Sequence, residues 1–464
     1  MATDRHAHTM THTGAEAVRY YEKALDSLLF FREETAAETG AMLDASPRSA
    51  MGNVLRAYRG LLGTEEKDAA EAATAFAAYR KDVPVAELTP RERMHVEAAS
   101  SWLGGDFHEA GRLLAELVVA YPKDALALAV GHQTDFFTGN AALLRDRIGG
   151  ALSAWDEHDP HYGLLQGMYA FGLEEAGHYT RAERVGLEAV ERNPRDVWGI
   201  HAVVHSYEMQ GRYEDGIRFL DTRTGDWSTG NYLTVHNWWH YALYVLETGR
   251  TDDVLAVHDA ALRHDGSAGG AMELLDAAAL LWRLYLAGID TGERWPALAD
   301  AWAARHDGPY YAFNDVHAVM AYVGADRLSD AERLIRDRRT WLEGTGTGAG
   351  VSNVAMTAEI GLPACRALVA YGQRRYADAV DELLPLRRRF HDFGGSHAQR
   401  DALQKTLVEA ALRAGRHDLA RTLLSERAGL RPQCPYDLKA RARLARATAA
   451  ASRTDRSGNP AGHG

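Results

Sequence analysis

The chain has 464 residues and carries 52 Lys and Arg against 64 Asp and Glu, which gives a formal net charge of −12 at pH 7. This excess of negative charge argues against a nucleic-acid partner, because proteins that bind a phosphate backbone need a basic surface. Two cysteines cannot form a disulfide framework, and no run approaches the roughly 18 consecutive apolar residues of a membrane span, so we expect a soluble, cytoplasmic protein with no membrane partner.

Both ends of the chain have a composition that disfavours folding. The first residues are polar and include His6, His8 and His12, and the last ones are rich in Ser, Gly, Arg and Pro. Such segments bury too little apolar area to offset their conformational entropy. We therefore predict a disordered tail with solvated histidines over residues 1–15, a single helical domain over 16–440, and a helix end with a disordered tail over 441–464.

Turn-like glycines recur at a nearly constant spacing. Spacings of 34, 38, 34 and 38 residues separate Gly105, Gly139, Gly177, Gly211 and Gly249. Glycine suits the left-handed turn between the two helices of a repeat, and the Tyr179 and Ala182 that follow one of them match a second repeat helix. Less regular turns of the same kind are predicted at Gly288, Gly324, Gly372 and Gly415.

Between these turns the apolar residues recur every three or four positions, as in ERLIRDRRTWLEG, and alternating β-branched runs are absent. The sequence therefore predicts an all-α fold. We expect a tetratricopeptide-like α-solenoid in which roughly ten helical hairpins form a right-handed superhelix. The concave groove of such a superhelix is lined mostly by the first helix of each hairpin, so polar residues on those helices point at a groove.

Histidines recur one helical turn apart on two successive first helices. His201 and His205 stand at i and i+4 with Glu208 at i+7, and His236 with His240 repeats the i, i+4 spacing. At about 100° per residue, each set lies on one helical face. Paired imidazoles near a carboxylate can hold zinc or another divalent first-row ion, so the four histidines are candidate metal ligands.

Other polar residues on predicted first helices complete two candidate groups. A metal ion would activate a water nucleophile, whereas without metal a histidine beside a carboxylate can act as a general base and an arginine can hold a substrate carboxylate or phosphate. Catalytic or orienting roles are predicted for Glu208, Asp276, Asp315, His317 and His397. Substrate contacts are predicted for His132, Asp135, Trp239, Arg283, Asn314 and Arg400.

The same residues admit a structural interpretation. HxxxH lacks the catalytic glutamate of HExxH, and buried histidines and carboxylates can satisfy one another and fix the register of the repeats. Ser396 with Gln399 matches a capping box, which accounts for part of that segment without a functional role. The residues alone leave both interpretations open.

Five long segments in order carry a family resemblance: HAVVHSYEMQGR, NYLTVHNWWHYALY, LLDAAALLWRLYLAG, AFNDVHAVMAY and GGSHAQRD. Between roughly Glu16 and Pro432 the chain resembles the tetratricopeptide repeat protein 38 family. The resemblance implies an α-helical superhelix with these segments as hallmarks, and no particular reaction. It gives as matching positions His201, His205, Glu208, His236, His240, Asp276, Asp315, His317 and His397.

Two classes of function are consistent with this pattern. We expect a histidine and carboxylate centre in the concave groove of a hydrolase or lyase-type enzyme, with a divalent metal such as zinc as the candidate cofactor and a small polar or peptide-like substrate. The alternative is a non-catalytic scaffold that binds a protein or peptide and uses its histidine network structurally. Peptide-clamping grooves usually rely on Lys, Arg and Asn, whereas His, Asp, Trp and Tyr dominate here.

Overall fold

The computed structural model describes residues 2–263, 269–305, 308–345 and 350–457. Two short strands, β1 (Ala2–Thr3) and β2 (Thr9–Met10), pair antiparallel at the start. The helices that follow as far as the middle of the chain are α1 (Ala15–Leu29), α2 (Thr35–Ala45), α3 (Ala50–Leu62), α4 (Glu66–Asp82), α5 (Pro90–Leu103), α6 (Phe107–Ala120), α7 (Ala125–Phe137), α8 (Ala141–Ala151), α9 (Tyr162–Glu175), α10 (Tyr179–Arg192), α11 (Val197–Met209) and α12 (Tyr213–Asp221).

The remaining helices are α13 (Thr224–Trp227), α14 (Leu233–Glu247), α15 (Thr251–Val257), α16 (Ala271–Leu286), α17 (Arg294–Arg305), α18 (Ala312–Gly324), α19 (Leu328–Thr345), α20 (Ser352–Ala355), α21 (Leu362–Gly372), α22 (Tyr376–Leu383), α23 (His397–Arg413), α24 (His417–Leu430) and α25 (Pro435–Ser457). Short 3₁₀ turns are η1 (Val85–Glu87), η2 (Leu152–Ala154), η5 (Leu384–Leu386) and η6 (Phe390–Phe393). The π-helical turns are η3 (His258–Leu262) and η4 (Met356–Gly361).

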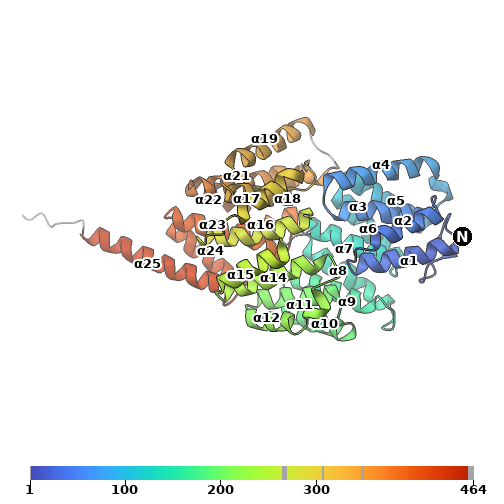
Figure 1. Cartoon of the computed structure of the whole chain (residues 1–464), viewed down its shortest axis with the longest axis horizontal. Helices are drawn as coiled ribbons and strands as arrows, with labels where there is room; N and C mark the ends of the chain where they lie inside the picture. The colour runs from blue at the N-terminus through green and yellow to red at the C-terminus, as the bar shows by residue number, and fades with distance from the viewer. Residues whose placement is uncertain (1, 264–268, 306–307, 346–349, 458–464) are drawn as a thin grey trace, which may run out of the picture.

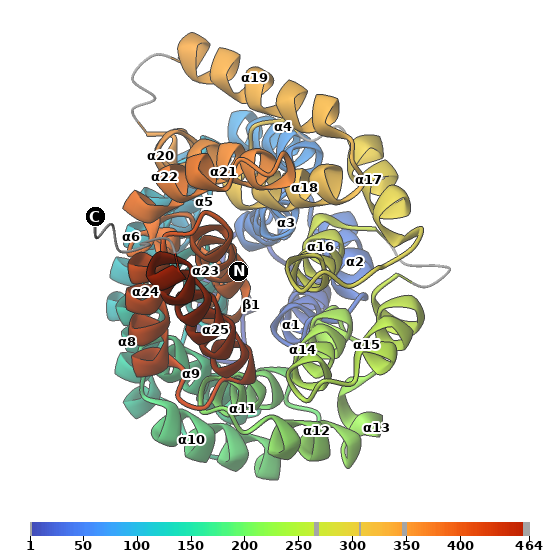
Figure 2. The same ribbon diagram turned by 90° about the vertical axis from the view of Figure 1, so that its left-hand side faces the viewer.

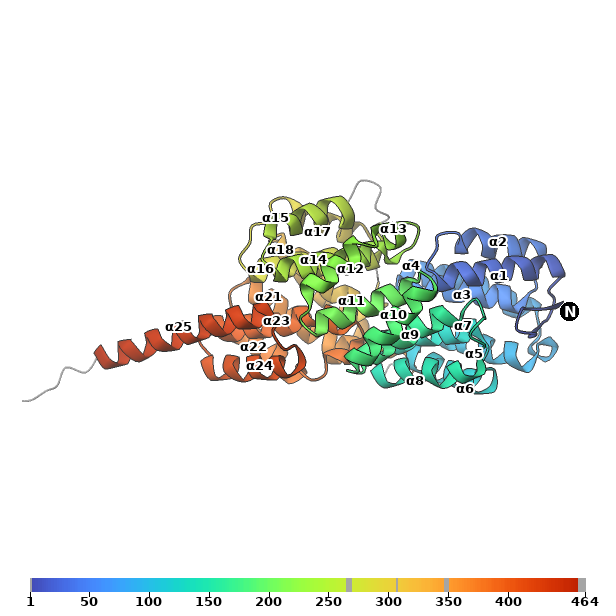
Figure 3. The same ribbon diagram turned by 90° about the horizontal axis from the view of Figure 1, so that it is seen from below.

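These helices form an array of antiparallel hairpins (Figure 1). Neighbouring helices pack as the pairs α1/α2, α3/α4, α5/α6, α7/α8, α9/α10, α11/α12, α14/α15, α16/α17, α18/α19, α21/α22 and α23/α24. The last helix, α25, packs on α24 and extends beyond the array (Figure 3). Eleven hairpins therefore follow one another in the described part of the chain, close to the ten predicted, and the predicted all-α solenoid is confirmed.

The array winds as a right-handed superhelix, and its second turn lies on its first (Figure 2). Hydrogen bonds join residues more than two hundred positions apart. Ala271 N donates to Glu65 Oε1 at 2.9 Å, and Asn314 Nδ2 donates to the Thr64 carbonyl at 3.0 Å. Ser352 N likewise donates to the Gly105 carbonyl at 2.9 Å. Stacking of the two superhelical turns therefore brings into contact helices whose proximity the local sequence pattern does not predict.

The predicted turn glycines follow two different rules. Gly177 has φ of +83° and Gly211 has φ of +71°, so both take the left-handed conformation that favours glycine. At the turns predicted for Gly324 and Gly372, the residues in the left-handed conformation are instead Asp326 and Arg374. Gly324 is required for another reason, because a Cβ there would lie 2.3 Å from the Trp295 ring.

First and second helices of a hairpin differ in burial. In α10 the buried residues are Ala182, Val185, Gly186, Ala189 and Val190, a single apolar stripe. In α11 all thirteen residues are buried, because this helix contacts α9, α10, α12, α14 and α23. Polar side chains on such a first helix must find partners inside the protein or remain unsatisfied.

The N-terminal stretch differs from the predicted disordered tail. Residues 2–13 form the β1–β2 hairpin, which docks on the array with Met10 fully buried. Thr11 donates from its backbone N and its hydroxyl to the Glu92 carboxylate at 2.8 and 2.9 Å. Composition does not predict this ordering, because the partners belong to distant helices. At the other end α25 continues to Ser457, and residues 458–464 of the predicted tail lie outside the described residues.

Among the helices that the structure describes, one stretch, Ser352–Gly372, is long and apolar enough by composition to cross a membrane. Within the most apolar 18 residues of this stretch, 67% of the residues are buried. Its main helix, α21, packs against α18, α19 and α22. Core helices of soluble proteins meet the same criterion, so we assign this stretch to the core of the array.

Candidate metal centre

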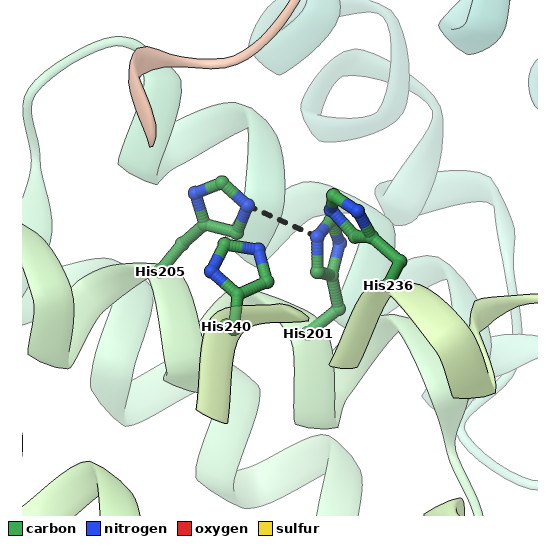
Figure 4. Close-up of side chains that lie close together, drawn as sticks. All are labelled: His201, His205, His236 and His240. Carbon is green, nitrogen blue, oxygen red and sulfur yellow. Dashed lines mark hydrogen bonds between the residues drawn. The ribbon is translucent and has the colours of Figure 1, made fainter. Parts of the chain in front are cut away.

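The first half of the centre lies on α11. Asp196 caps this helix by accepting a hydrogen bond from Gly199 N at 2.8 Å, which fixes where the helix starts and hence where its faces point. His201 and His205 then lie one turn apart on the same face, as the spacing predicts. Figure 4 shows both rings pointing toward the neighbouring helix.

The second half of the centre lies on α14, which crosses α11. His236 and His240 again lie one turn apart, and Tyr244 follows on the same face. The Tyr244 hydroxyl is fully buried and donates to the Val204 carbonyl of α11. This bond fixes the register of α14 on α11 and brings the two histidine pairs opposite each other.

The four imidazole rings form one cluster (Figure 4). Each ring offers a nitrogen, and these four nitrogens lie within 4.8 Å of one another. The Nε2 atoms of His201 and His205 are 3.0 Å apart, and the ring centroids of His205 and His240 are 4.3 Å apart. His236 lies 4.7 Å from His240 by centroid. The structure therefore brings together the four histidines that the spacing places on two successive first helices.

Two of the rings are oriented by carboxylates. His240 Nδ1 donates to Glu208 Oε2 at 3.1 Å, and His236 Nδ1 donates to Asp276 Oδ2 at 2.8 Å. The other oxygen of Glu208 accepts a hydrogen bond from Arg431 Nη1 at 3.0 Å. Carboxylates in this position fix the tautomer of a metal-binding histidine and turn its second nitrogen toward the ion.

Several polar atoms of the centre lack partners. His240 Nε2, His201 Nδ1 and His205 Nδ1 are buried and accept or donate no hydrogen bond within the described ranges of the chain. Each unsatisfied buried polar group costs about 1–3 kcal/mol, so a native structure rarely keeps several together. This concentration distinguishes the centre from an ordinary core hydrogen-bond network.

Burial favours the neutral form of His201, His205 and His240. It is the main cause that lowers the pKa of His201 and His205 well below the ordinary range, with a further contribution from the neighbouring histidines. It also lowers the pKa of His240, although the hydrogen bond to Glu208 opposes this shift. Neutral imidazole is the form that ligates metal ions.

A third carboxylate, Glu174 of α9, was not anticipated among the site residues. Its Oε2 lies 3.5 Å from His205 Nδ1, its side chain is fully buried, and neither oxygen has a hydrogen-bond partner among the residues described. Burial, and then the charges of Glu175 and Glu208, raise its pKa well above the ordinary value. Glu174 precedes the turn glycine Gly177 by three residues, as Glu208 precedes Gly211, so the repeat register could have identified it.

Aromatic rings enclose the centre. The Trp239 ring stacks on His236 with centroids 5.1 Å apart, and Phe171 stacks on His201 at 4.9 Å. The Arg283 guanidinium lies over Trp239 and donates to the Ala398 carbonyl. Trp239 and Arg283, predicted as substrate contacts, are therefore buried packing around the histidines. His236, with 12% of its side chain exposed, is the most accessible of the four rings.

His397 and Arg400 adjoin the centre at the start of α23. His397 N donates to Glu175 Oε1 at 2.8 Å, and Arg400 Nη2 donates to Glu175 Oε2 at 3.1 Å. Burial raises the pKa of Glu175, but the charges of His397 and Arg400 bring it below the ordinary value. Glu175 was also missing from the predicted residues. It anchors α23 to α9 beside Glu174.

The capping box predicted at Ser396 and Gln399 is present, since each side chain bonds the other residue's backbone N–H. His132 lies deeper, where its Nε2 donates to the Met168 carbonyl at 3.1 Å. Burial lowers the pKa of His132 to about 3.

The other predicted site residues have partners elsewhere. Asp135 forms a bidentate ion pair with Arg147, at 2.7 and 2.8 Å. Asp315 forms one with Arg338, and Asn314 bonds Thr64 in the α3–α4 connection. Each of these contacts joins helices of the array. The expectation that every polar first-helix residue faces a shared groove is wrong for these three, because a buried first helix has polar residues on all its faces.

His317 also has a local partner. Its Nδ1 donates to the Phe313 carbonyl at 2.8 Å, one turn earlier on α18. Burial lowers its pKa from 6.5 to about 4, and the charge of Asp276 opposes that shift. His317 is therefore close enough to Asp276, the carboxylate that orients His236, to feel its charge. Among the described residues, the structure records no contact between His317 and the four rings.

A tetrahedral zinc ion with bonds of about 2.0–2.1 Å to nitrogen places its ligands about 3.3 Å from one another. The Nε2 atoms of His201 and His205 are already at 3.0 Å, and the widest separation among the four nitrogens is at most 4.8 Å. The residues present therefore fit a four-coordinate ion with a complete set of protein ligands.

No family model matches this chain. It is similar in structure to the human IFIT1 dimer with m7Gppp-AAAA, at 12% identity and a TM-score of 0.43 over 97% of this chain and 96% of that one. The IFIT1 dimer with PPP-AAAA gives 13% identity and 0.41 over the same shares. The APC/C hetero-tetramer Cut9-Hcn1 gives 13% identity and 0.40 over 93% of this chain and 76% of that one.

Proposed function

We propose that this solenoid binds one divalent first-row transition ion, zinc in the first instance, between α11 and α14. His201, His205, His236 and His240 supply imidazole nitrogens, while Glu208 and Asp276 hold two of the rings in place. The observation that carries the proposal is the cluster of four imidazoles, three of which are buried and have one ring nitrogen each without a hydrogen-bond partner among the described residues. Softer nitrogen ligands favour zinc, nickel or copper over magnesium or calcium.

The ion would join neighbouring repeats of the superhelix. α11 and α14 each contribute two rings, and Asp276 brings in α16 behind them. Structural zinc sites have four protein ligands and no open position, whereas catalytic ones keep a position for water or substrate. Four enclosed histidines match the closed type. The proposed role is therefore to fix the curvature of a protein- or peptide-binding scaffold.

A second candidate function is hydrolysis or a lyase-type step on a small polar or peptide-like substrate. The observation that favours it is Glu174, a carboxyl group held protonated beside His205 and suited to act as a general acid. In this case His236, the most exposed ring, would be displaced to open a coordination position. A bound ion in such a site lowers the pKa of a water ligand to about 7.

We also propose that the chain belongs to the tetratricopeptide repeat protein 38 family. The segments that carry the resemblance lie on α11, α14, α16, α18 and the start of α23. Three of these helices supply the four histidines and the two orienting carboxylates. A profile built from curated family members should align these segments in one register, and a misaligned HxxxH pair would contradict membership.

Elemental analysis of the untagged protein tests the metal proposal. The protein is stripped with chelator, loaded with equimolar or excess Zn²⁺ and desalted. Wild type should retain one ion more than the double variant His205→Ala/His240→Ala. A matched control is His132→Ala, which removes a buried histidine outside the cluster. Equal metal content in wild type and in a folded double variant would overturn the proposal.

Cobalt substitution gives a second readout. Tetrahedral Co²⁺ bound by nitrogen ligands absorbs strongly in the visible range, so the spectrum reports coordination rather than content. Turnover assays on ester, peptide and phosphate substrates then separate the two candidate functions. Activity that disappears with chelator and with Glu174→Gln supports the enzyme, and a metal-loaded protein without turnover supports the scaffold.

A further inference from the structure

A second group of metal-type ligands lies where the N-terminal hairpin docks on the array. His6 belongs to the hairpin between β1 and β2, whereas Asp159 and His161 immediately precede α9. Each of the three offers one ligand atom, and these atoms lie within 4.8 Å of one another. Their positions are more than 150 residues apart in sequence, so only docking of the hairpin assembles the group.

His161 is buried and His6 is partly buried, and each has one ring nitrogen without a hydrogen-bond partner among the described residues. His161 is 1% exposed, and 8% of the His6 side chain is exposed. His161 Nε2 donates to Asp26 Oδ1 at 2.7 Å, but His161 Nδ1 and His6 Nε2 have no hydrogen-bond partner in the part of the chain that the structure describes. His6 Nδ1 lies 3.6 Å from Asp159 Oδ2, too far for a hydrogen bond.

Charge around the group favours a cation. Carboxylates accompany the two arginines nearby: Glu22 and Asp26 pair with Arg5, which also lies 3.4 Å from His161 Nε2, and Asp4 pairs with Arg91. Arg5 is taken up by Glu22 and Asp26, at 2.6 and 3.1 Å. Asp159 Oδ1 accepts a hydrogen bond from His161 N at 3.0 Å, and among the described residues the ion pair recorded for Asp159 is with His6 rather than with an arginine.

The group also adjoins a cleft. Asp159 lines an open cleft of about 300 Å³ together with Glu157, Arg192 and Asp196. Asp196 Oδ2 is buried and has no partner in the described ranges. Two imidazoles and one carboxylate fill only three positions of a metal ion, so further positions remain for water or for a small ligand in this cleft.

We propose that His6, Asp159 and His161 form a second divalent-cation site, for a first-row ion such as Zn²⁺ or Ni²⁺, that fastens the N-terminal hairpin to the start of α9. It is independent of the four-histidine centre, since the two groups share no residue. The bound ion satisfies the free ring nitrogens and the Asp159 charge together. It also stabilises a hairpin whose strands are only two residues long.

The test uses the full chain, stripped and reloaded with Zn²⁺ or Ni²⁺. His6→Ala should lower the metal content by one ion per chain while circular dichroism stays unchanged, because His6 lies outside the helical array. His161→Ala should give the same loss. The matched control is His12→Ala on the same hairpin, whose ring bonds Glu87 at 2.7 Å and belongs to none of the ligand groups found among the described residues. It should leave the metal content unchanged.

Limited trypsin digestion measures opening of the N-terminal hairpin, which the metal content does not report. Cleavage after Arg5 requires the hairpin to open, and bound ion should slow it by about 100-fold at a free ion concentration 100 times Kd. The protection should vanish in His6→Ala and persist in His205→Ala/His240→Ala. Equal metal content in wild type and His6→Ala, or cleavage of wild type that does not respond to metal, would overturn this site without affecting the four-histidine centre.

Discussion

Two buried polar regions of this molecule use similar residues in opposite ways. At the C-terminal end, Asp401 faces Arg427 at 2.6 Å and Lys405 at 3.4 Å, and Asp437 faces the same arginine at 2.6 Å. Each charge there meets an opposite charge. In the centre between α11 and α14, imidazoles face other imidazoles, and several nitrogens have no partner within the described ranges.

The contrast separates a closed network from an open one. In the C-terminal network each charge is compensated by an opposite one, although Arg427 Nη2 and Asp437 Oδ2 have no hydrogen-bond partner among the described residues, so we assign this network a structural role. Rings that present lone pairs to one another need a proton or a metal ion. Glu208 links both regions, since one oxygen accepts from Arg431 and the other from His240. Removing partners in each region should therefore have different consequences.

The largest expected effect comes from breaking the closed network. Asp401→Ala leaves Arg427, Lys405 and Arg431 with less compensation in a buried site, where removal of one partner costs about 3–5 kcal/mol of unfolding free energy. Urea denaturation measures this loss. The control, Asp418→Ala, breaks the exposed pair with Arg421 and should leave the urea midpoint unchanged. A small effect of Asp401→Ala would contradict the assignment of this network as structural.

The next effect concerns the open centre. A ligand that binds only the folded state adds about 2.7 kcal/mol to the unfolding free energy at a free concentration 100 times Kd. Zn²⁺ should therefore raise the denaturation midpoint of wild type. In His205→Ala/His240→Ala any remaining rise should come from the hairpin site and disappear when His6→Ala is added. An undiminished zinc response in the triple variant would argue against both sites.

A moderate effect is expected from pH at a histidine outside the centre. His317 has its pKa lowered to about 4, so below about 6.5 the unfolded chain binds a proton that the folded protein does not. Stability then falls as pH falls, by about 1 kcal/mol between pH 6 and pH 5. His317→Gln should remove that part of the slope while the rest of the curve keeps its shape. Identical slopes would show that His317 is protonated in the folded protein.

The periodicity of the sequence was sufficient to predict the fold class. Turn glycines such as Gly177 and Gly211, followed by Tyr179 and Tyr213, predicted helical hairpins because the pattern is local. Stacking of the second superhelical turn on the first was beyond such reasoning. The bond between Asn314 and Thr64 spans 250 residues, and no local pattern encodes it.

Part of the four-histidine centre could also be predicted, because its histidines follow a local pattern. His201, His205, His236 and His240 lie on adjacent repeats, where helical periodicity decides which residues meet. Partners from distant repeats, such as Arg431 for Glu208, depend on the winding of the superhelix. For His6 of the hairpin site, composition predicts only a solvated tail, because composition treats a segment as if it were isolated, and no sequence pattern links it to Asp159 and His161.

The smallest expected effect, the difference at pH 4.5 without metal, tests the carboxyl group beside the open centre. Burial and the neighbouring charges of Glu175 and Glu208 raise the pKa of Glu174, so the folded protein keeps a proton that the unfolded chain loses above about 4.5. Glu174→Gln replaces one neutral group with another of similar shape, so in chelator at pH 4.5 the two proteins should differ by less than about 1 kcal/mol. As pH rises, wild type should lose stability relative to the variant until the raised pKa is passed.

Urea titrations at several pH values measure this divergence, with Glu183→Gln, whose partner Arg212 is nearer the surface, as control. Parallel curves for wild type and Glu174→Gln would mean that Glu174 is ionised when buried, and the rings of the open centre would then have to carry the matching proton.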